Sequence, residues 1–468
     1  MANIFPCPGQ VSVAVIARGR VTCAAPRPWS SMHQLFVRRE HFAMLGTPAK
    51  ETAGHFGTVS VFVSAFLVFS LMAVGCHKSS TPNGKESVQV DTSADEYRQL
   101  DRYIRSAMKQ WSVPGLAIAV VRGDSMLFAK GYGVRKIGTR DSVDTSTIFG
   151  LLSATKTFTT TALAMLAEEG KLAWDDPVVR HLPNFRLSDS LRAEQLTIRD
   201  LVSHRTGYAD PVHLWHESGL SREEIVDRLS TVEPVAPLRS EFHYNNAMYV
   251  VAGEVVEVVS GKSWDAFVQK RILDPLDMNH SAPTPSALEE RSDVASPHSR
   301  RLFNTFGSVQ PSETIRFENI APAGAIQTNA KDMTAWLKMH LGGGKYDGKR
   351  LLDTASIRDL QTPRVSVPDD HLGPLSRPAD SLSYGSGWFV LDYRGQKVAF
   401  HGGGAPGLRS YVGIMPGKNL GVVVLSNMHG TGISQALTYY TFDLFTEKKP
   451  LDWSGLFYEA TRSWWQFW

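Results

Sequence analysis

The chain has 468 residues, of which 43% are hydrophobic and 20% are charged, an ordinary composition for a globular protein with one large core or two domains. Its formal net charge of +3 is too small to favour nucleic acid as a partner. No glycine-rich phosphate loop joins a strand to a helix, and no cysteine and histidine cluster has zinc-ligand spacing. We therefore expect no metal, no cofactor and no nucleic-acid partner.

An apolar stretch runs from Val59 to Val74 near the amino terminus. It is too short for a comfortable membrane span, but its length fits the hydrophobic region of a signal peptide. Small residues then precede Cys76, and this arrangement resembles the lipobox of bacterial lipoproteins, in which the cysteine becomes lipidated. Ala73 departs from that pattern, because leucine is commoner there. An uncleaved anchor helix is the alternative interpretation.

The lipobox interpretation divides the amino-terminal region into three parts. We expect a possible mis-called extension at residues 1–43, a lipoprotein-type signal segment at residues 44–76 and a flexible linker at residues 77–95. The mature protein would then be exported to the bacterial periplasm or cell envelope and held at the membrane by a lipid on Cys76. No other cysteine would remain in it, so no internal disulfide is expected.

The globular part begins with a helix and a hairpin. Apolar residues recur at helical spacing between Ala94 and Gln110. Two strand-like segments follow, Leu116–Val121 and Met126–Ala129, and Gly123-Asp124 between them is typical of a tight hairpin turn. The sequence therefore predicts an amphipathic helix followed by an antiparallel strand pair.

Beyond the hairpin the pattern is mostly helical, and strands return only near the carboxyl terminus. The predicted helices are Thr157–Glu169, Thr197–Ser203, Arg222–Thr231, Ala247–Ser260, Trp264–Leu273, Asn329–His340, Thr354–Gln361 and about Gly432–Thr446. The predicted later strands are Ser386–Leu391, Lys397–Phe400, Arg409–Met415 and Leu420–Ser426. This order predicts an α/β (α+β) fold with one antiparallel sheet, built from residues 96–152 and 381–448, and an inserted, mostly helical region at residues 157–380.

Ser153 and Lys156 form an S-x-x-K pair at the junction of these two regions. On a helix, positions three apart lie on one face, so the lysine amine can approach the serine hydroxyl. A desolvated lysine can take the proton of a serine and activate it as a nucleophile. The free N–H groups at the start of a helix would favour an oxyanion beside Ser153. The pair is therefore a candidate for nucleophilic catalysis.

Tyr244 and Asn246 form a Y-x-N motif just before an apolar helix. A phenol can carry a proton if nearby cations lower its pKa, and an amide can orient both a lysine and a substrate. The alternative is that Tyr244 simply packs under the helix. His204, at the exit of a short predicted helix, is better explained as a structural residue than as a catalytic one.

A glycine-rich segment, His401-Gly402-Gly403-Gly404, stands at the end of a predicted strand. Glycines there let a substrate backbone pair closely with the strand edge, and an exposed N–H can complete an oxyanion hole. His401, Gly403 and Gly404 are therefore candidate substrate-binding residues. A glycine-rich turn with a structural histidine is the alternative.

In order and spacing, these motifs resemble the penicillin-recognising serine hydrolases, which include class C β-lactamases, DD-peptidases and related esterases. The resemblance covers about residues 96–448. It rests on eight segments of the chain, which are Val113-Pro114-Gly115, Ser153-Ala154-Thr155-Lys156, Leu201–Gly207, Tyr244-Asn245-Asn246, Ala252-Gly253-Glu254, Pro275-Leu276-Asp277-Met278, Pro322-Ala323-Gly324-Ala325-Ile326 and His401-Gly402-Gly403.

The resemblance implies a role for each candidate residue. Ser153 would be the acylated nucleophile, Lys156 its partner and Tyr244 a proton shuttle. Asn246 would position the substrate, and the backbone amides of Ser153 and Gly404 would form the oxyanion hole. The implied fold is an antiparallel sheet flanked by helices plus a helical domain, which agrees with the pattern described above.

One departure from the family affects the expected substrate. Members that bind β-lactams best have K-T-G where this chain has His401-Gly402-Gly403. Lysine supplies a permanent cation for a substrate carboxylate, whereas histidine is charged only part of the time near neutrality. The H-x-G pattern resembles the branch of D-amino-acid peptidases and esterases, so efficient β-lactamase activity is not expected. His401 would bind a carboxylate as a cation or act as a neutral, orienting group.

The sequence leaves two functions open. The favoured one is a serine hydrolase that forms an acyl-enzyme on Ser153 and cleaves a small molecule or short peptide, either a carboxylic ester, a D-amino-acid peptide or, weakly, a β-lactam. The alternative is a penicillin-binding or peptidoglycan-peptide sensor of the same fold without turnover. The aromatic tail at residues 449–468 would rest on the membrane surface or cover the catalytic domain.

Overall fold

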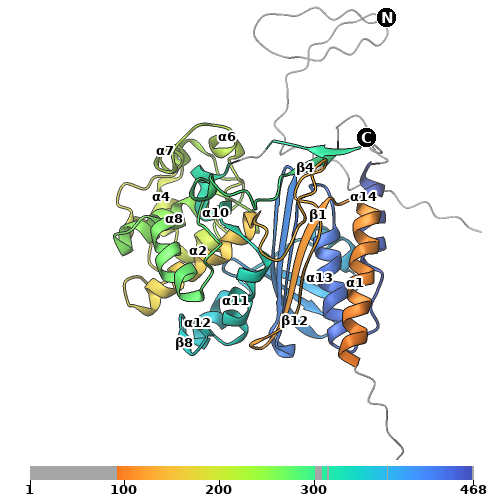
Figure 1. The fold of residues 1–468 in the computed structure, drawn as a ribbon. Helices are drawn as coiled ribbons and strands as arrows, with labels where there is room; N and C mark the ends of the chain where they lie inside the picture. The colour runs from red at the N-terminus through yellow and green to blue at the C-terminus, as the bar shows by residue number, and fades with distance from the viewer. Residues whose placement is uncertain (1–91, 301–307, 314–315, 377, 466–468) are drawn as a thin grey trace, which may run out of the picture. The chain divides into compact units, whose positions relative to one another are not determined.

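The computed structural model describes residues 92–300, 308–313, 316–376 and 378–465 (Figure 1). Cys76, the proposed signal segment and most of the predicted linker lie outside these residues, so lipidation and export stay predictions. The last four linker residues lie inside the first helix, α1 (Thr92–Trp111). In the part of the chain that the structure describes, no helix has both the length and the apolar character needed to cross a membrane.

One eight-stranded antiparallel sheet organises the described part of the chain. Its strands, in spatial order, are β2 (Ser125–Gly133), β1 (Gly115–Arg122), β14 (Leu420–Ser426), β13 (Leu408–Met415), β12 (Gln396–Ala405), β11 (Phe389–Tyr393), β10 (Ala379–Tyr384) and β9 (Val365–Ser366). The pairing of β1 with β14, from Leu116 opposite Ser426 to Arg122 opposite Leu420, joins the two ends of the sequence. This confirms the predicted sheet built from both ends.

The two faces of the sheet carry separate cores. Along β1, Ala117 and Val121 pack into the core on the side of the helical region, whereas Ile118 and Val120 pack into the other core. This alternation follows from the period of two along a strand. Figure 1 shows α1 and α13 (Ile433–Phe445) side by side on the second face, while α11 (Ala330–Leu341) covers the first.

The helical region follows the predicted order closely. Its longer helices and those with clear end signals are α2 (Lys156–Glu168), α5 (Ile198–Val202), α7 (Arg222–Arg228), α8 (Ala247–Ser260), α9 (Trp264–Val268), α11 and α12 (Thr354–Leu360), and its short ones are α3 (Val178–His181), α4 (Ser190–Gln195), α6 (Val212–Trp215) and α10 (Ala321–Gly324). Capping boxes at Thr197 and Ser221 begin α5 and α7, and Gly261, at φ +70°, ends α8. These local signals explain why the helix bounds could be predicted.

Short two-stranded pairs lie outside the main sheet. They are β3 (Phe149–Gly150) with β6 (Gln327–Thr328), β4 (His298–Arg300) with β5 (Val309–Pro311), and β7 (Lys345–Tyr346) with β8 (Lys349–Arg350). The first of these pairs matters for the site, because β3 leads directly into the turn that carries Ser153.

The sheet differs from the prediction along its carboxyl-terminal strands. The strand predicted at Ser386–Leu391 begins only at Phe389, because the backbone turns at Gly387, which has φ +80°. Only glycine fits at this position, since a Cβ there would lie 2.6 Å from the Thr160 hydroxyl. Strand β12 continues past Phe400 to Ala405, and β9 and β10 extend the sheet to residues before 381. The glycine-rich segment is therefore strand rather than turn.

The aromatic tail forms a further helix, α14 (Trp453–Trp465), which packs against α13. Trp453 is fully buried, and its indole N–H donates to the Asp443 carboxylate at 2.9 Å. The Trp111 indole donates to the Ser454 hydroxyl at 3.0 Å, which ties α14 to α1. The described part of the tail therefore packs against the folded domain, and its contact with a membrane surface stays a prediction.

Candidate active site

Ser153 lies in a single 3-10 turn, Leu152–Thr155, that leads directly into α2. Its neighbours in this turn are buried, whereas Ser153 is partly exposed. Leu152, the residue before it, has φ +55°, a left-handed conformation that strains a residue with a branched side chain. The strain is held by the pairing of β3 with β6, so the backbone presents Ser153 at a fixed place.

Lys156 is the first residue of α2, and its side chain is fully buried. Its ammonium group donates to the Asn246 side-chain oxygen at 2.7 Å and to the Ala323 carbonyl at 2.9 Å. The Lys156 Nζ atom lies 4.7 Å from the centre of the Tyr244 ring. Among the described residues it has no carboxylate in ion-pair distance. Burial lowers the pKa of Lys156 to about 7, and the charge of Asp210 opposes this shift.

The Tyr244 hydroxyl lies close enough to Ser153 for the serine to lower the pKa of the phenol. Burial raises the pKa of Tyr244, and the interaction with Ser153 only partly opposes this effect. The condition set for a proton-carrying phenol, a pKa lowered by nearby cations, is therefore not met, since burial raises this pKa and the charge of Asp210 adds to the shift. At neutral pH Tyr244 is a neutral phenol, and Lys156 is the stronger base beside Ser153.

Asn246 stands at the amino-terminal end of α8 with its amide fixed at both ends. Its oxygen accepts from Lys156, and its nitrogen donates to the Asp210 carboxylate at 2.7 Å. This places Asn246 beside the lysine, as the Y-x-N motif suggests. The substrate contact implied by the family resemblance stays a prediction.

His401 is 1% exposed and lies on β12. Its Nδ1–H donates to the Gly402 carbonyl at 2.8 Å, so its Nε2 accepts from the Tyr384 hydroxyl at 3.1 Å. Burial lowers the pKa of His401 to about 3, and the charge of Lys156 adds to this shift. Of the two roles considered for His401, the geometry favours the neutral, orienting one, because a charged ring would lack solvent.

His204 packs against the Y-x-N segment that contains Tyr244 and Asn246. Its Nδ1 accepts the backbone N–H of Asn245 at 3.1 Å, and its ring lies 4.3 Å from the Tyr244 ring. Burial and the charge of Lys156 lower its pKa well below the usual range. A neutral histidine that packs against Tyr244 has the structural role expected for it.

The edge of β12 is unpaired beyond Phe400, because β11 pairs with β12 only from Gln396 to that residue. Gly403 lies against the turn that carries Ser153, since a Cβ there would be 2.6 Å from the Leu151 carbonyl and 2.8 Å from the Leu152 Cβ. Gly404 is exposed at the same edge. An extended substrate segment can pair with this edge next to Ser153.

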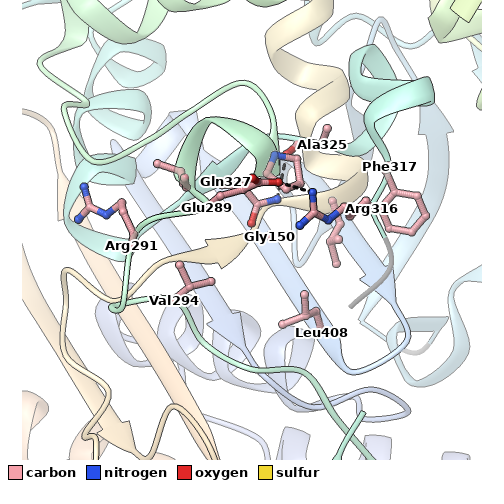
Figure 2. A pocket seen from close by; sticks show the side chains of 12 residues that line it. Gly150, Glu289, Arg291, Val294, Arg316, Phe317, Ala325, Gln327 and Leu408 are labelled. Atoms are coloured by element: carbon pink, nitrogen blue, oxygen red, sulfur yellow. Dashed lines mark hydrogen bonds and ion pairs between the residues drawn. The ribbon is translucent and has the colours of Figure 1, made fainter. Parts of the chain in front are cut away.

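A cavity of about 250 Å³ adjoins the turn of Ser153 on the side of Leu152. Figure 2 shows its lining, with Leu408 and Val294 on one side and the ion pair of Arg316 with Glu289 near its other side. Leu152 also packs with Leu408 in a small apolar cluster. The cavity therefore combines an apolar floor next to the turn of Ser153 with charges near its edge.

The sequence does not predict three groups of the site, which are Asp210, the Ala323 carbonyl and Tyr384. Asp210 follows the Leu201–Gly207 segment, and only the fold brings it to Asn246. The Ala323 carbonyl belongs to a quoted motif, but a backbone acceptor leaves no mark in the residue types. Tyr384 lies on β10, a strand that the sequence does not predict.

In the described ranges, no group of three or more His, Cys, Asp and Glu side chains is arranged to hold a metal ion. The Tyr244 phenol instead lies between the two residues of the S-x-x-K pair, since its ring is 4.7 Å from the Lys156 Nζ atom and its hydroxyl interacts with Ser153. The catalytic roles implied for the individual residues stay predictions.

The sequence matches the family model described as Beta-lactamase over residues 100–444. The chain belongs to the beta-lactamase family. It is 28% identical to a protein named unguisins hydrolase ungD from Aspergillus violaceofuscus, in a match that covers 70% of this chain and 60% of that protein. It is 24% identical to the protein flp of Staphylococcus aureus, over 76% of this chain and 68% of flp.

Solved structures of the beta-lactamase family's fold agree with the architecture. An octameric penicillin-binding protein homologue from Pyrococcus abyssi superposes with a TM-score of 0.65 at 27% identity, over 75% of this chain and 78% of that chain. A D-stereospecific amidohydrolase from Streptomyces superposes with a TM-score of 0.61 at 22% identity, over 74% of this chain and 98% of that chain. The family and the fold expected from the sequence motifs are thereby confirmed.

Proposed function

We propose that this member of the beta-lactamase family is a serine hydrolase that cleaves an ester or amide bond through an acyl-enzyme on Ser153. One observation carries the proposal. The buried Lys156 amine, whose pKa burial lowers to about 7, lies 4.7 Å from the Tyr244 ring, and the hydroxyl of this neutral tyrosine interacts with Ser153, one helical turn before the lysine. Such a lysine is a free amine for a large part of the time at neutral pH, so it can act as a base.

The proposed acylation begins when the Lys156 amine takes the Ser153 proton. The Ser153 oxygen attacks the carbonyl carbon of the substrate, and the backbone N–H groups of Ser153 and Gly404 stabilise the oxyanion. Tyr244 then donates its proton to the leaving group and regains one from the Lys156 ammonium. The serine proton thus ends on the leaving alcohol or amine, and water releases the acyl group in a second step.

The substrate we infer has an apolar acyl part. The cavity beside Leu152 offers an apolar floor, whereas His401, buried and neutral, supplies no cation for a carboxylate on the leaving group. Carboxylic esters, and D-amino-acid peptides whose leaving group carries no carboxylate, fit these requirements better than β-lactams, which we expect to be weak substrates. The hydrolase name of the relative from Aspergillus violaceofuscus supports bond cleavage as the activity.

The proposal is tested by covalent labelling. A fluorophosphonate should label the wild type, and the variant Ser153→Ala should stay unlabelled. Ser106→Ala provides a matched control, because Ser106 and Lys109 repeat the S-x-x-K spacing on the exposed side of α1. Equal labelling of wild type and Ser153→Ala would remove Ser153 from the proposed role.

A sensor without turnover is the second candidate, because the Pyrococcus abyssi relative is named a penicillin-binding protein homologue. The two functions share the acylation step and differ only in the release of the acyl group. Repeated release of p-nitrophenol from a p-nitrophenyl ester, lost in Lys156→Ala, would establish the hydrolase. A single burst equal to the amount of protein would instead establish the sensor.

A further inference from the structure

Asp210 is a carboxylate next to the candidate active site that belongs to none of its motifs. Its Oδ1 accepts the Asn246 backbone N–H at 2.9 Å and the Trp215 indole N–H at 3.2 Å. Its Oδ2 accepts the Asn246 side-chain nitrogen at 2.7 Å. All three partners are neutral donors, as an ionised carboxylate requires. In the described part of the chain, Asp210 has no cation within ion-pair distance.

These bonds decide which way the Asn246 amide faces. Because the amide nitrogen donates to Asp210, the amide oxygen must point the other way, and there it accepts from Lys156 at 2.7 Å. Without an acceptor at position 210, the amide could turn and present its nitrogen to the ammonium group. Asp210 is thus connected to Lys156 through one oriented side chain.

Most of the titratable groups that face Lys156 are neutral, so few negative charges lie near its ammonium group. Four titratable side chains surround it besides Asp210, namely Tyr244 and Tyr249 from the start of α8, His204 from the end of α5 and His401 from β12. Burial raises the pKa of both tyrosines and lowers the pKa of both histidines, so all four are neutral near pH 7. Burial raises the pKa of Asp210, whereas the donors from Asn246 and Trp215 and the charge of Lys156 oppose this shift, so among these neighbours only Asp210 can supply a negative charge.

We infer that Asp210 is a positioning residue of the reaction, the third member that orients the base in a Ser153–Lys156 pair. It holds the Asn246 oxygen toward the lysine, and its charge stabilises the ammonium that forms when Ser153 loses its proton. The arrangement corresponds to the role of the carboxylate in a serine–histidine–aspartate triad. This inference rests on the proposed function and adds a residue to it.

If Asp210 had a purely structural role, its replacement would affect the labelling rate in a different way. The loop that carries Asp210 is also tied to the start of α8 by Asn245, whose side-chain nitrogen donates to the carbonyls of Tyr208 and Ala209 at 3.2 and 3.0 Å. If Asp210 served only this attachment, its replacement would lower the rate equally at every pH. If it stabilises the ammonium, its replacement must change the pH dependence.

The test measures the rate of fluorophosphonate labelling against pH in the full chain. The wild-type rate should rise with pH and reach half its maximum near pH 7, where the Lys156 amine loses its proton. In Asp210→Asn the half-maximum should move to lower pH by about one unit, the low end of the effect of a single nearby charge. The maximal rate should fall about tenfold because the ammonium loses its support.

Two further variants keep the result interpretable. Asp210→Glu retains the charge, so its half-maximum should stay near that of the wild type even if its maximal rate is lower. Asp332→Asn is the control, because Asp332 is also a buried carboxylate that accepts from the His280 backbone N–H and the Ser281 hydroxyl, with the His280 ring at 3.7 Å, and Lys156 is not among its contacts. The half-maximum is independent of how much protein is folded, so partial unfolding cannot imitate the shift.

An unchanged half-maximum in Asp210→Asn, with lower rates at every pH, would overturn the role of Asp210 and leave the proposed function intact. Absence of labelling in the wild type, or equal labelling of Ser153→Ala, would instead overturn the proposed function itself. The two failures are therefore distinguishable in the same experiment.

Discussion

Lys156 changes its chemistry because of its place in the fold. An exposed lysine has a pKa of about 10.4 and is almost always charged at neutral pH. Here the side chain is fully buried, two oxygen atoms accept from it, and its pKa is about 7. The same residue that would otherwise be a surface cation becomes a base suited to neutral conditions.

This predicts a specific pH dependence for the hydrolysis of a p-nitrophenyl ester. The amine must be unprotonated to accept the Ser153 proton, so kcat/KM should rise with pH, reach half its maximum near pH 7 and level off above it. Lys156→Ala should lower kcat/KM by roughly a hundredfold or more, the usual effect of losing a general base. A rate already level at about pH 5.5 would contradict the assignment.

For His401 we expect, in contrast to Lys156, that substrate preference does not depend on pH. Two substrates that differ only in a free or an amidated carboxyl group on the leaving side should keep a constant ratio of kcat/KM between about pH 5 and 8. The reason is that a histidine with a pKa of about 3 stays neutral throughout this range. A ratio that falls as pH rises through the ordinary histidine pKa would show that His401 is charged when substrate binds.

At the residue scale, the sequence identifies the candidate site residues, but it does not show the surroundings that shift their pKa values. The order and spacing of the motifs point to Ser153, Lys156, Tyr244 and Asn246, and in the structure Lys156 contacts Asn246 and the Tyr244 ring while Tyr244 interacts with Ser153. The direction of the Tyr244 pKa shift could not be found, because the residues that bury this phenol come from distant parts of the chain. Asp210 was missed for a similar reason.

Strand β12 fixes the position of the turn that carries Ser153. Gly403 is buried against the turn of Ser153, and a Cβ there would lie 2.3 Å from the Ser410 hydroxyl and 2.6 Å from the Leu151 carbonyl. The Ser410 hydroxyl itself donates to that carbonyl at 2.5 Å. A side chain at position 403 would therefore push this turn away from the strand.

We expect Gly403→Ala to displace the nucleophile and to lower the free energy of unfolding by about 1–3 kcal/mol, as overpacking does. The labelling rate should fall in the same variant. Gly417→Ala is the control, because a Cβ there meets only the end of the Gln396 side chain, at 3.0 Å. Urea unfolding and fluorophosphonate labelling check both effects, and equal behaviour of the two variants would show that the contact is not restrictive.

Prediction of the elements succeeded where local signals were strong. Helix α8 has the predicted bounds because an apolar run ends at a glycine that can adopt the left-handed conformation. Strands β9 and β10 were missed because the first has two residues and the second shows no regular alternation of buried and exposed positions. Short strands at and next to the edge of a sheet are specified by their partners rather than by their own sequence.

The cavity beside Leu152 gives a prediction about acyl-group preference. Leu408 begins β13 and lines the cavity, so its size should set the room for the acyl group. Leu408→Phe should lower the ratio of kcat/KM for a phenylacetyl ester over an acetyl ester, and Leu408→Ala should raise it. The ratio does not depend on the amount of folded protein. If both variants shifted it in the same direction, the cavity would not be the acyl site.

For the whole molecule, the sheet explains why the site residues are so far apart in sequence. The first strands pair with the last, as β1 does with β14, and the helical region is inserted between them. Ser153 comes from the point where the chain leaves the sheet, Tyr244 from the inserted region and His401 from the returning strands. The site therefore forms only when both ends of the chain have come together.

The last helix completes the opposite face of this sheet, and Trp453 is the residue through which it does so. Its ring is fully buried among Tyr393, Tyr439 and Phe457, and its indole donates to Asp443, which also accepts from Tyr393. Removing this side chain would leave a cavity and take one donor from a buried carboxylate. Both effects lower the stability of the folded state.

We therefore expect Trp453→Ala to lower the free energy of unfolding by about 3–5 kcal/mol, the usual cost of truncating a buried aromatic residue. Leu456→Ala on the same helix is the matched control, because Leu456 is 41% exposed and should change stability by less than about 1 kcal/mol. Urea unfolding followed by circular dichroism measures both. Comparable values for the two variants would mean that α14 is not part of the cooperative unit. A large loss confined to Trp453→Ala would make this helix a structural cover of the catalytic domain, with its main anchor unavailable to a membrane surface.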